Sequence, residues 1–150
     1  MYCAINGLIF EKNGKPYRGR LMMENNPNSI GEAWIENGIL YGKYTVEHID
    51  LDLAKKLIAL RIEKSGDSTY PVFVDVTDVK TVSKEARETL ATGDGIKNMS
   101  ACALVVGSPV NRLLGNFFLS VSKPGVPTRL FTSKEDALAW LSTFKKEKVD

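Results

Sequence analysis

The chain has 150 residues, which is enough for one domain with a single apolar core. Its composition, 43% hydrophobic and 25% charged, is that of a globular protein and excludes a disordered chain. The net charge of +2 comes from 20 basic and 18 acidic residues spread along the chain, which argues against nucleic-acid binding, because that function needs clustered Lys and Arg.

The N-terminal region is predicted to lie outside the main domain. Residues 5–17 could form a strand pair around Asn13-Gly14, since both residues of such a turn tolerate positive φ. The polar, turn-rich stretch that follows predicts a linker. We therefore expect an extension with linker at residues 1–28 and a domain at residues 29–150. Met22 or Met23 is an alternative start of the protein.

The domain is predicted to begin with a β-hairpin and then to alternate helices with strands. Residues 33–45 flank Asn37-Gly38, a strong hairpin signal. Buried strands are expected at residues 71–76 and 101–106, and a last strand at residues 128–132. Helices are expected after four residues that can cap an N-terminus, namely Asp50, Ser83, Ser108 and Ser133. We expect the second helix to reach Ile96, and Asp136 to complete a capping box with Ser133. This order predicts a mostly parallel mixed sheet with an antiparallel edge hairpin and four helices.

The element order resembles the STAS fold of the anti-sigma-factor antagonists over about residues 30–145. Residues 72–79, in which a buried strand ends in Asp75, resemble the central strand of that superfamily. Residues 128–141 resemble the C-terminal part of small bacterial STAS-like proteins. The resemblance implies an α/β, STAS-like domain of a bacterial protein that regulates by binding another protein.

In the anti-sigma antagonists, a serine at the start of the helix after the central strand is phosphorylated, and this switches partner binding. The matching stretch here, residues 78–86, lacks the Asp-Ser-Ser-Gly-like sequence of the family. Ser83 falls beside the acceptor position, where Lys84 or Glu85 would stand. We therefore interpret Ser83 as a helix cap, although a phosphate there would lie near a positive helix end and could alter docking.

No catalytic or metal-binding constellation is found in the sequence. His48 is the only histidine, and a triad would need it between a carboxylate and a nucleophile. Cys3 and Cys102 are the only cysteines, too few for a zinc site or a disulfide framework. Cys102 lies in an apolar run and is expected to be buried. We predict a protein without enzymatic activity, metal or cofactor.

No apolar run approaches the roughly 20 residues that span a bilayer. The first residues also lack the apolar stretch of a secretory signal. These features predict a cytoplasmic protein without a transmembrane segment.

The first candidate site is the rim at the carboxyl ends of the strands, where ligands of open α/β sheets bind near helix N-termini. The polar residues expected there are our binding or regulatory candidates: Asp75, Thr77, Asp78, Ser83, Ser108, Asn111 and Arg112. Arg112 could bind a phosphate or carboxylate, or it could pair with Asp78 in a structural ion pair.

The second candidate site is the third helix, which is apolar on more than one side. Such breadth indicates either deep burial or a second face for a partner, and Gly115 would allow another element to approach closely. The interface or pocket candidates are Leu114, Phe117 and Phe118.

Two functions are compatible with these features. The leading hypothesis is a regulatory or scaffold domain that binds an unknown protein partner or forms a homodimer. The alternative is a carrier of a small apolar or lipid-like ligand, whose cavity would be lined by Phe117, Phe118 and Trp140.

Overall fold

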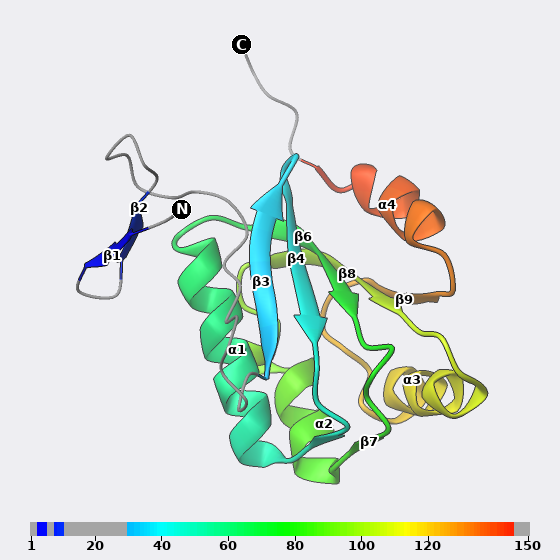
Figure 1. The fold of residues 1–150 in the computed structure, drawn as a ribbon. Coiled ribbons are helices and arrows are strands. Elements are labelled where there is room, and N and C mark those ends of the chain that lie inside the picture. The colour runs from blue at the N-terminus through cyan, green and yellow to red at the C-terminus, as the bar shows by residue number, and fades with distance from the viewer. Residues whose placement is uncertain (1–2, 6–7, 11–29, 146–150) are drawn as a thin grey trace.

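The computed structural model of the chain describes residues 3–5, 8–10 and 30–145 (Figure 1). Its main sheet has five strands in the order β3-β4-β6-β8-β9. The strands are β3 (Gly31–Glu36), β4 (Ile39–Tyr44), β6 (Tyr70–Asp75), β8 (Met99–Val105) and β9 (Thr128–Phe131). β3 pairs antiparallel with β4, and the other neighbours pair in parallel. The predicted mixed sheet with an antiparallel edge hairpin is confirmed.

The β3–β4 hairpin turns at the predicted dipeptide. Asn37 has φ 51° and Gly38 has φ 77°. Both values lie in the left-handed region that a two-residue hairpin turn requires, and Asn and Gly adopt it more readily than other residues. The turn sets the register, in which Glu36 lies opposite Ile39.

Four helices follow their predicted capping residues. The side chain of each cap accepts a hydrogen bond from the backbone N–H three residues on, which satisfies a donor that the first turn leaves without a partner. The helices and caps are α1 (Leu51–Ser65, Asp50), α2 (Lys84–Ala91, Ser83), α3 (Pro109–Val121, Ser108) and α4 (Lys134–Ser142, Ser133). The carboxylate that contacts Ser133 belongs to Glu135, 2.9 Å from the hydroxyl, and not to Asp136 as predicted.

α2 is shorter than predicted and does not include Ile96. It ends at Ala91, and a 3₁₀ turn, Gly93–Gly95, follows it. Gly93 has φ 53°, and a Cβ atom at Gly95 would overlap the carbonyl oxygen of Thr89. The two glycines therefore fold back tightly where the sequence pattern suggested more helix.

Two small strand pairs complete the described elements. β5 (His48–Ile49) pairs in parallel with β7 (Thr81–Val82) just before α2. Near the N-terminus, β1 (Cys3–Ile5) pairs antiparallel with β2 (Leu8–Phe10). This pair differs from the one predicted for residues 5–17, and the predicted turn at Asn13-Gly14 lies outside the described residues.

Helices cover both faces of the main sheet (Figure 1). α4 covers one face, where Tyr41, Phe73 and Leu141 are buried together. α1, α2 and α3 cover the other face, with Leu57 and Ala86 at the centre of that core and Leu114 packed against them. No helix in the described part of the chain is long and apolar enough to cross a membrane.

Candidate functional site

The first two candidates of the predicted rim, Asp75 and Thr77, bind each other. Asp75 ends β6, and its Oδ1 accepts hydrogen bonds from the backbone N–H of Thr77 at 3.0 Å and from Thr77 Oγ1 at 2.7 Å. These bonds close the loop after the strand in a local Asx turn. The geometry explains the loop conformation without a ligand.

The two rim serines cap helices. Ser83 Oγ accepts from the backbone N–H of Ala86 at 3.2 Å, and Ser108 Oγ accepts from that of Asn111 at 3.0 Å. The interpretation of Ser83 as a cap is confirmed. Each hydroxyl therefore stabilises the first turn of its helix.

Asn111 joins three segments of the rim from inside the protein. Its side chain is 2% exposed. Nδ2 donates to the carbonyl oxygens of Val76 at 2.6 Å and Val79 at 2.7 Å, and Oδ1 accepts from the backbone N–H of Gly107 at 3.1 Å. The amide thus fastens α3 to the loop after β6, which is a structural arrangement.

Arg112 and Asp78 are both exposed. Within residues 30–145 no ion pair joins them, so the structural alternative for Arg112 is not seen.

His48 is exposed as predicted, and its Nδ1 contacts Thr81 Oγ1 across the β5–β7 pair. The described residues contain no group of His, Cys, Asp and Glu that could hold a metal ion.

α3 presents an apolar stripe to solvent. The exposed fractions are 62% for Val110, 71% for Leu113, 45% for Phe117 and 56% for Val121. These four side chains recur at spacings of three and four residues and are the exposed large hydrophobics of the described residues. We call them the outer stripe of α3. A helix that is exposed in this way on one side is a candidate partner surface.

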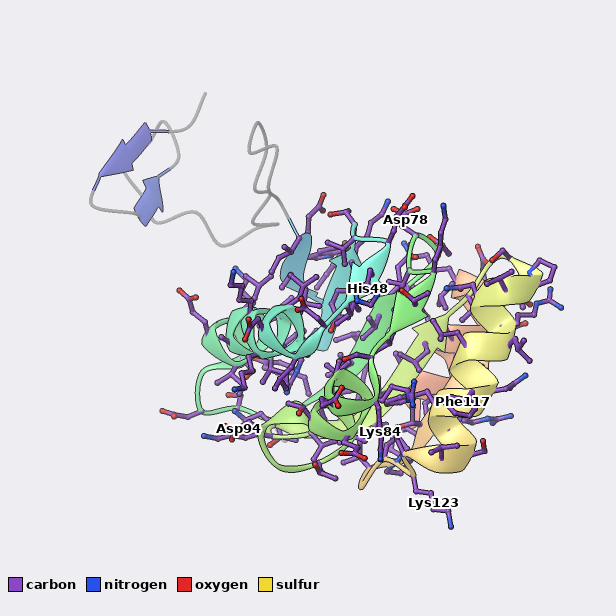
Figure 2. All side chains as sticks on the ribbon, turned by 90° about the horizontal axis from the view of Figure 1, so that it is seen from below. His48, Asp78, Lys84, Asp94, Phe117 and Lys123 are labelled. Atoms are coloured by element: carbon purple, nitrogen blue, oxygen red, sulfur yellow. The ribbon has the colours of Figure 1, made fainter. Side chains whose placement is uncertain are left out.

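The segment around α3 carries only positive charge. Residues 95–134 contain no Asp or Glu, and the basic residues on α3 or next to its end are Arg112 and Lys123. Arg129 and Lys134 instead lie over aromatic rings on the face of the sheet that α4 covers. α2 lies beside α3 in Figure 2, where Lys84 and Phe117 are labelled, and it carries two basic and two acidic side chains. The charges of α3 and of the turn after it therefore favour an anionic partner.

The inner side of α3 lines a cavity of about 100 Å³ between α1, α2, α3 and the sheet. Leu114 and Phe118 face it from α3, Leu90 from α2, and Val74 and Leu104 from the sheet. The three interface or pocket candidates therefore lie on two sides of α3. Leu114 and Phe118 line the cavity, whereas Phe117 belongs to the outer stripe. Trp140 packs on the opposite face of the sheet, 5.7 Å from the Phe131 ring, so its predicted place in this cavity is wrong.

Two arginines at this cavity were not predicted. Arg87 of α2 lies with its guanidinium carbon 4.6 Å from the centroid of the Phe117 ring, in a cation–π contact that links α2 to α3. Arg61 of α1 is 5% exposed. It donates to the carbonyl oxygens of Lys97 at 2.5 Å, Asp94 at 2.8 Å and Gly95 at 3.2 Å. Burial lowers the pKa of Arg61.

Cys102 lies on the sheet side of the same cavity as a free, buried thiol, as predicted. Burial raises its pKa to about 12, so the reactive thiolate is disfavoured. In a Cys3→Ser variant, we expect iodoacetamide at pH 8.5 to alkylate the folded protein at least about 100-fold more slowly than the urea-unfolded protein.

The raised pKa of Cys102 also determines how the stability of the protein changes with pH. The unfolded thiol loses its proton near pH 8.5, whereas the folded thiol keeps it, so stability falls as the pH rises from about 8.5 toward 12. In the alkylation experiment, equal rates for the folded and the unfolded protein would show that the thiol of Cys102 is accessible and would contradict its assignment as a buried group.

The DUF7793 family, described as a domain of unknown function, matches residues 33–145. This range covers all four helices and the main sheet apart from the first two residues of β3. No curated protein matches the chain.

Two solved structures are similar to this one. The first is an uncharacterised protein of the DUF3478 family with a SpoIIAA-like fold from Shewanella loihica PV-4, with 18% identity, a TM-score of 0.53, and coverage of 74% of this chain and 91% of that chain. The second is an anti-sigma factor antagonist from Mycobacterium paratuberculosis, with 17% identity, a TM-score of 0.52, and coverage of 78% and 97%. At this identity the similarity shows the fold, which is STAS-like as the sequence predicted.

Proposed function

This chain belongs to the DUF7793 family of domains of unknown function, and we propose that it is a non-enzymatic regulatory domain whose outer stripe of α3 binds another protein. The observation that carries this proposal is the placement of Val110, Leu113, Phe117 and Val121 on one side of one helix, all at least 45% exposed. Apolar side chains gathered in this way are typical of a docking surface for a helix or an apolar segment.

The charge around the stripe selects the class of partner. Because α3 and the turn after it carry Arg112 and Lys123 and no acidic side chain, two copies of this face would bring like charges together. An acidic amphipathic segment of another protein would instead complement both the apolar stripe and the positive field. We therefore favour a different, acidic protein over a homodimer through this face.

The fold supports a regulatory role of this kind. One similar structure is an anti-sigma factor antagonist, a protein named for its action on another regulatory protein. Among the rim residues, Asp75, Ser83 and Asn111 hold their own loops and helices together and are not proposed as contacts with the partner. Thr77, Asp78, Ser108 and Arg112 stay candidates for the edge of the interface.

The probe for this proposal is an amphipathic peptide of about 18 residues with a leucine stripe flanked by glutamates, long enough to form helix on binding. We expect it to bind the protein more tightly than the same peptide with lysines, by about tenfold or more at low salt, with the difference shrinking as salt is added. Fluorescence anisotropy of labelled peptides measures both affinities.

Leu113→Asp should weaken binding of the glutamate peptide by about tenfold without changing the stability of the protein, because Leu113 is 71% exposed. Asn116→Asp adds the same charge at another exposed position of α3 and serves as the matched control. Equal binding of both peptides, or equal loss in the two variants, would show that the outer stripe is not the docking surface.

A further inference from the structure

We propose that the cavity between α2 and α3 is a binding site for a small apolar carboxylate, with its tail among the apolar side chains and its carboxylate on Arg87. This site uses the inner side of α3 and adjoins the outer stripe at Phe117, whose ring contacts Arg87.

The interior of the cavity suits a hydrocarbon tail. Val74 and Leu104 of the sheet, Leu90 of α2, and Leu114 and Phe118 of α3 form apolar walls. Leu90, Leu114 and Phe118 are only partly buried, which places them where the cavity opens to solvent. A tail entering between the two helices would cover this apolar surface, which favours binding.

The volume limits the tail to a short chain or a single ring. The cavity measures about 100 Å³. An apolar cavity of about 150 Å³ in a protein core holds benzene. The smaller space here can accept a few carbons but cannot enclose a long lipid chain, so a lipid is a poor occupant.

The charged head must lie at the opening, because the walls offer almost no polar surface to a buried carboxylate. Arg87 is at that position, since it lines the cavity and also lies over the half-exposed Phe117 ring. Its guanidinium donates to the Val82 carbonyl oxygen at 3.0 Å. Within residues 30–145 no carboxylate pairs with it.

Arg87 therefore keeps donors that can bind a carboxylate in a two-pronged arrangement. The second arginine of the cavity cannot take this role as readily. Arg61 already donates to three backbone carbonyl oxygens that hold it in place.

The test uses hexanoate as the probe and the full chain with ¹³C-labelled methyl groups. We expect saturable shifts in the methyl NMR signals of Leu90, Ile96 and Leu114, with a Kd on the order of 0.1 to 1 mM for a ligand of this size. Hexanol has the same tail without the charge, and it should bind about tenfold more weakly.

Arg87→Leu should weaken hexanoate binding about tenfold and leave hexanol binding unchanged. Arg112→Leu removes an exposed arginine from α3 and should change neither affinity. Leu113→Asp, which tests the protein-binding surface, should also leave hexanoate binding unchanged, so the failure of one proposal would not imply failure of the other.

Three results would overturn the proposal. One is the absence of saturable shifts at Leu90, Ile96 and Leu114 up to about 10 mM hexanoate, well above the expected Kd. Another is a shift confined to Leu113 and Val121, which would place the probe on the outer stripe. The third is equal affinity of hexanoate and hexanol for the unmodified protein, which would exclude a role for Arg87 without requiring any variant.

Discussion

Replacement of Arg61 by methionine is expected to lower the free energy of unfolding by about 3 kcal/mol. The guanidinium donates to the carbonyl oxygens of Asp94, Gly95 and Lys97, and it fastens α1 to the turn that follows α2. Methionine fills similar space but removes the donor of all three bonds. The bond to Gly95 is buried, and its loss costs about 1 to 3 kcal/mol. The bonds to Asp94 and Lys97 are part-buried and add less, since the Asp94 carbonyl also accepts from the backbone N–H of Lys97. Removal of a buried positive charge offsets part of that loss. Urea unfolding followed by circular dichroism measures the difference.

Two further variants separate the hydrogen bonds from the charge. Lys56→Met makes the same kind of change on the exposed side of α1 and should alter stability by less than about 0.5 kcal/mol. Arg61→Lys keeps the charge but has one nitrogen for three acceptors, and it should fall between the native protein and Arg61→Met. If Arg61→Met is as stable as the native protein, the three hydrogen bonds do not hold the turn in place.

The sequence predicted those parts of the fold that depend on neighbouring residues. The Asn37-Gly38 turn and the four helix caps follow from the conformational preferences of one or two residues, and each appears where it was expected. The mostly parallel sheet with its antiparallel edge hairpin followed from the alternation of helices and strands. The close approach expected at Gly115 is also present, because a Cβ atom there would lie 2.7 Å from Leu130 Cδ2.

The roles of Arg61 and Arg87 could not be predicted in this way, because their partners are distant in the sequence. Arg61 binds carbonyl groups more than 30 residues away, and Arg87 contacts the ring of Phe117 on another helix. One signal was available for Arg61. It lies four and three residues after Leu57 and Ile58 on one side of the helix, where a charged residue within an apolar stripe indicates a buried cation with partners.

The sequence also could not predict which side of α3 faces solvent and which side lines the cavity. Leu113 and Leu114 are equally apolar, but one is 71% exposed and the other lines the cavity. Which side faces inward depends on where the helix sits over β8 and β9, and on the buried Asn111 that fixes its first turn. The pattern showed that α3 has more apolar surface than one core face needs, and the structure assigns the surplus to the outer stripe.

Replacement of Asn111 by aspartate is expected to lower the free energy of unfolding by about 3 kcal/mol at pH 7.5, and part of this loss should be recovered at pH 5. In the native protein, Nδ2 donates to the carbonyl oxygens of Val76 and Val79 at 2.6 and 2.7 Å. A carboxylate in that position would place an oxygen that can only accept hydrogen bonds against these two carbonyl oxygens inside the protein. Asn116→Asp, at an exposed position of the same helix, is the matched control and should change stability by less than about 0.5 kcal/mol at either pH.

The pH dependence follows from the sign of the pKa shift. Burial against carbonyl oxygens raises the pKa of the new carboxyl group in the folded state above the value of about 4 in the unfolded chain. Between these two values the folded state binds the proton and the unfolded state does not, so stability falls as the pH rises through this window. At low pH the protonated carboxyl can donate to one of the two carbonyl groups and restore one bond. Urea midpoints of both variants at pH 5 and pH 7.5 test this, and equal losses at the two pH values would mean that the loop after β6 moves away from position 111 and that its attachment to α3 is not rigid.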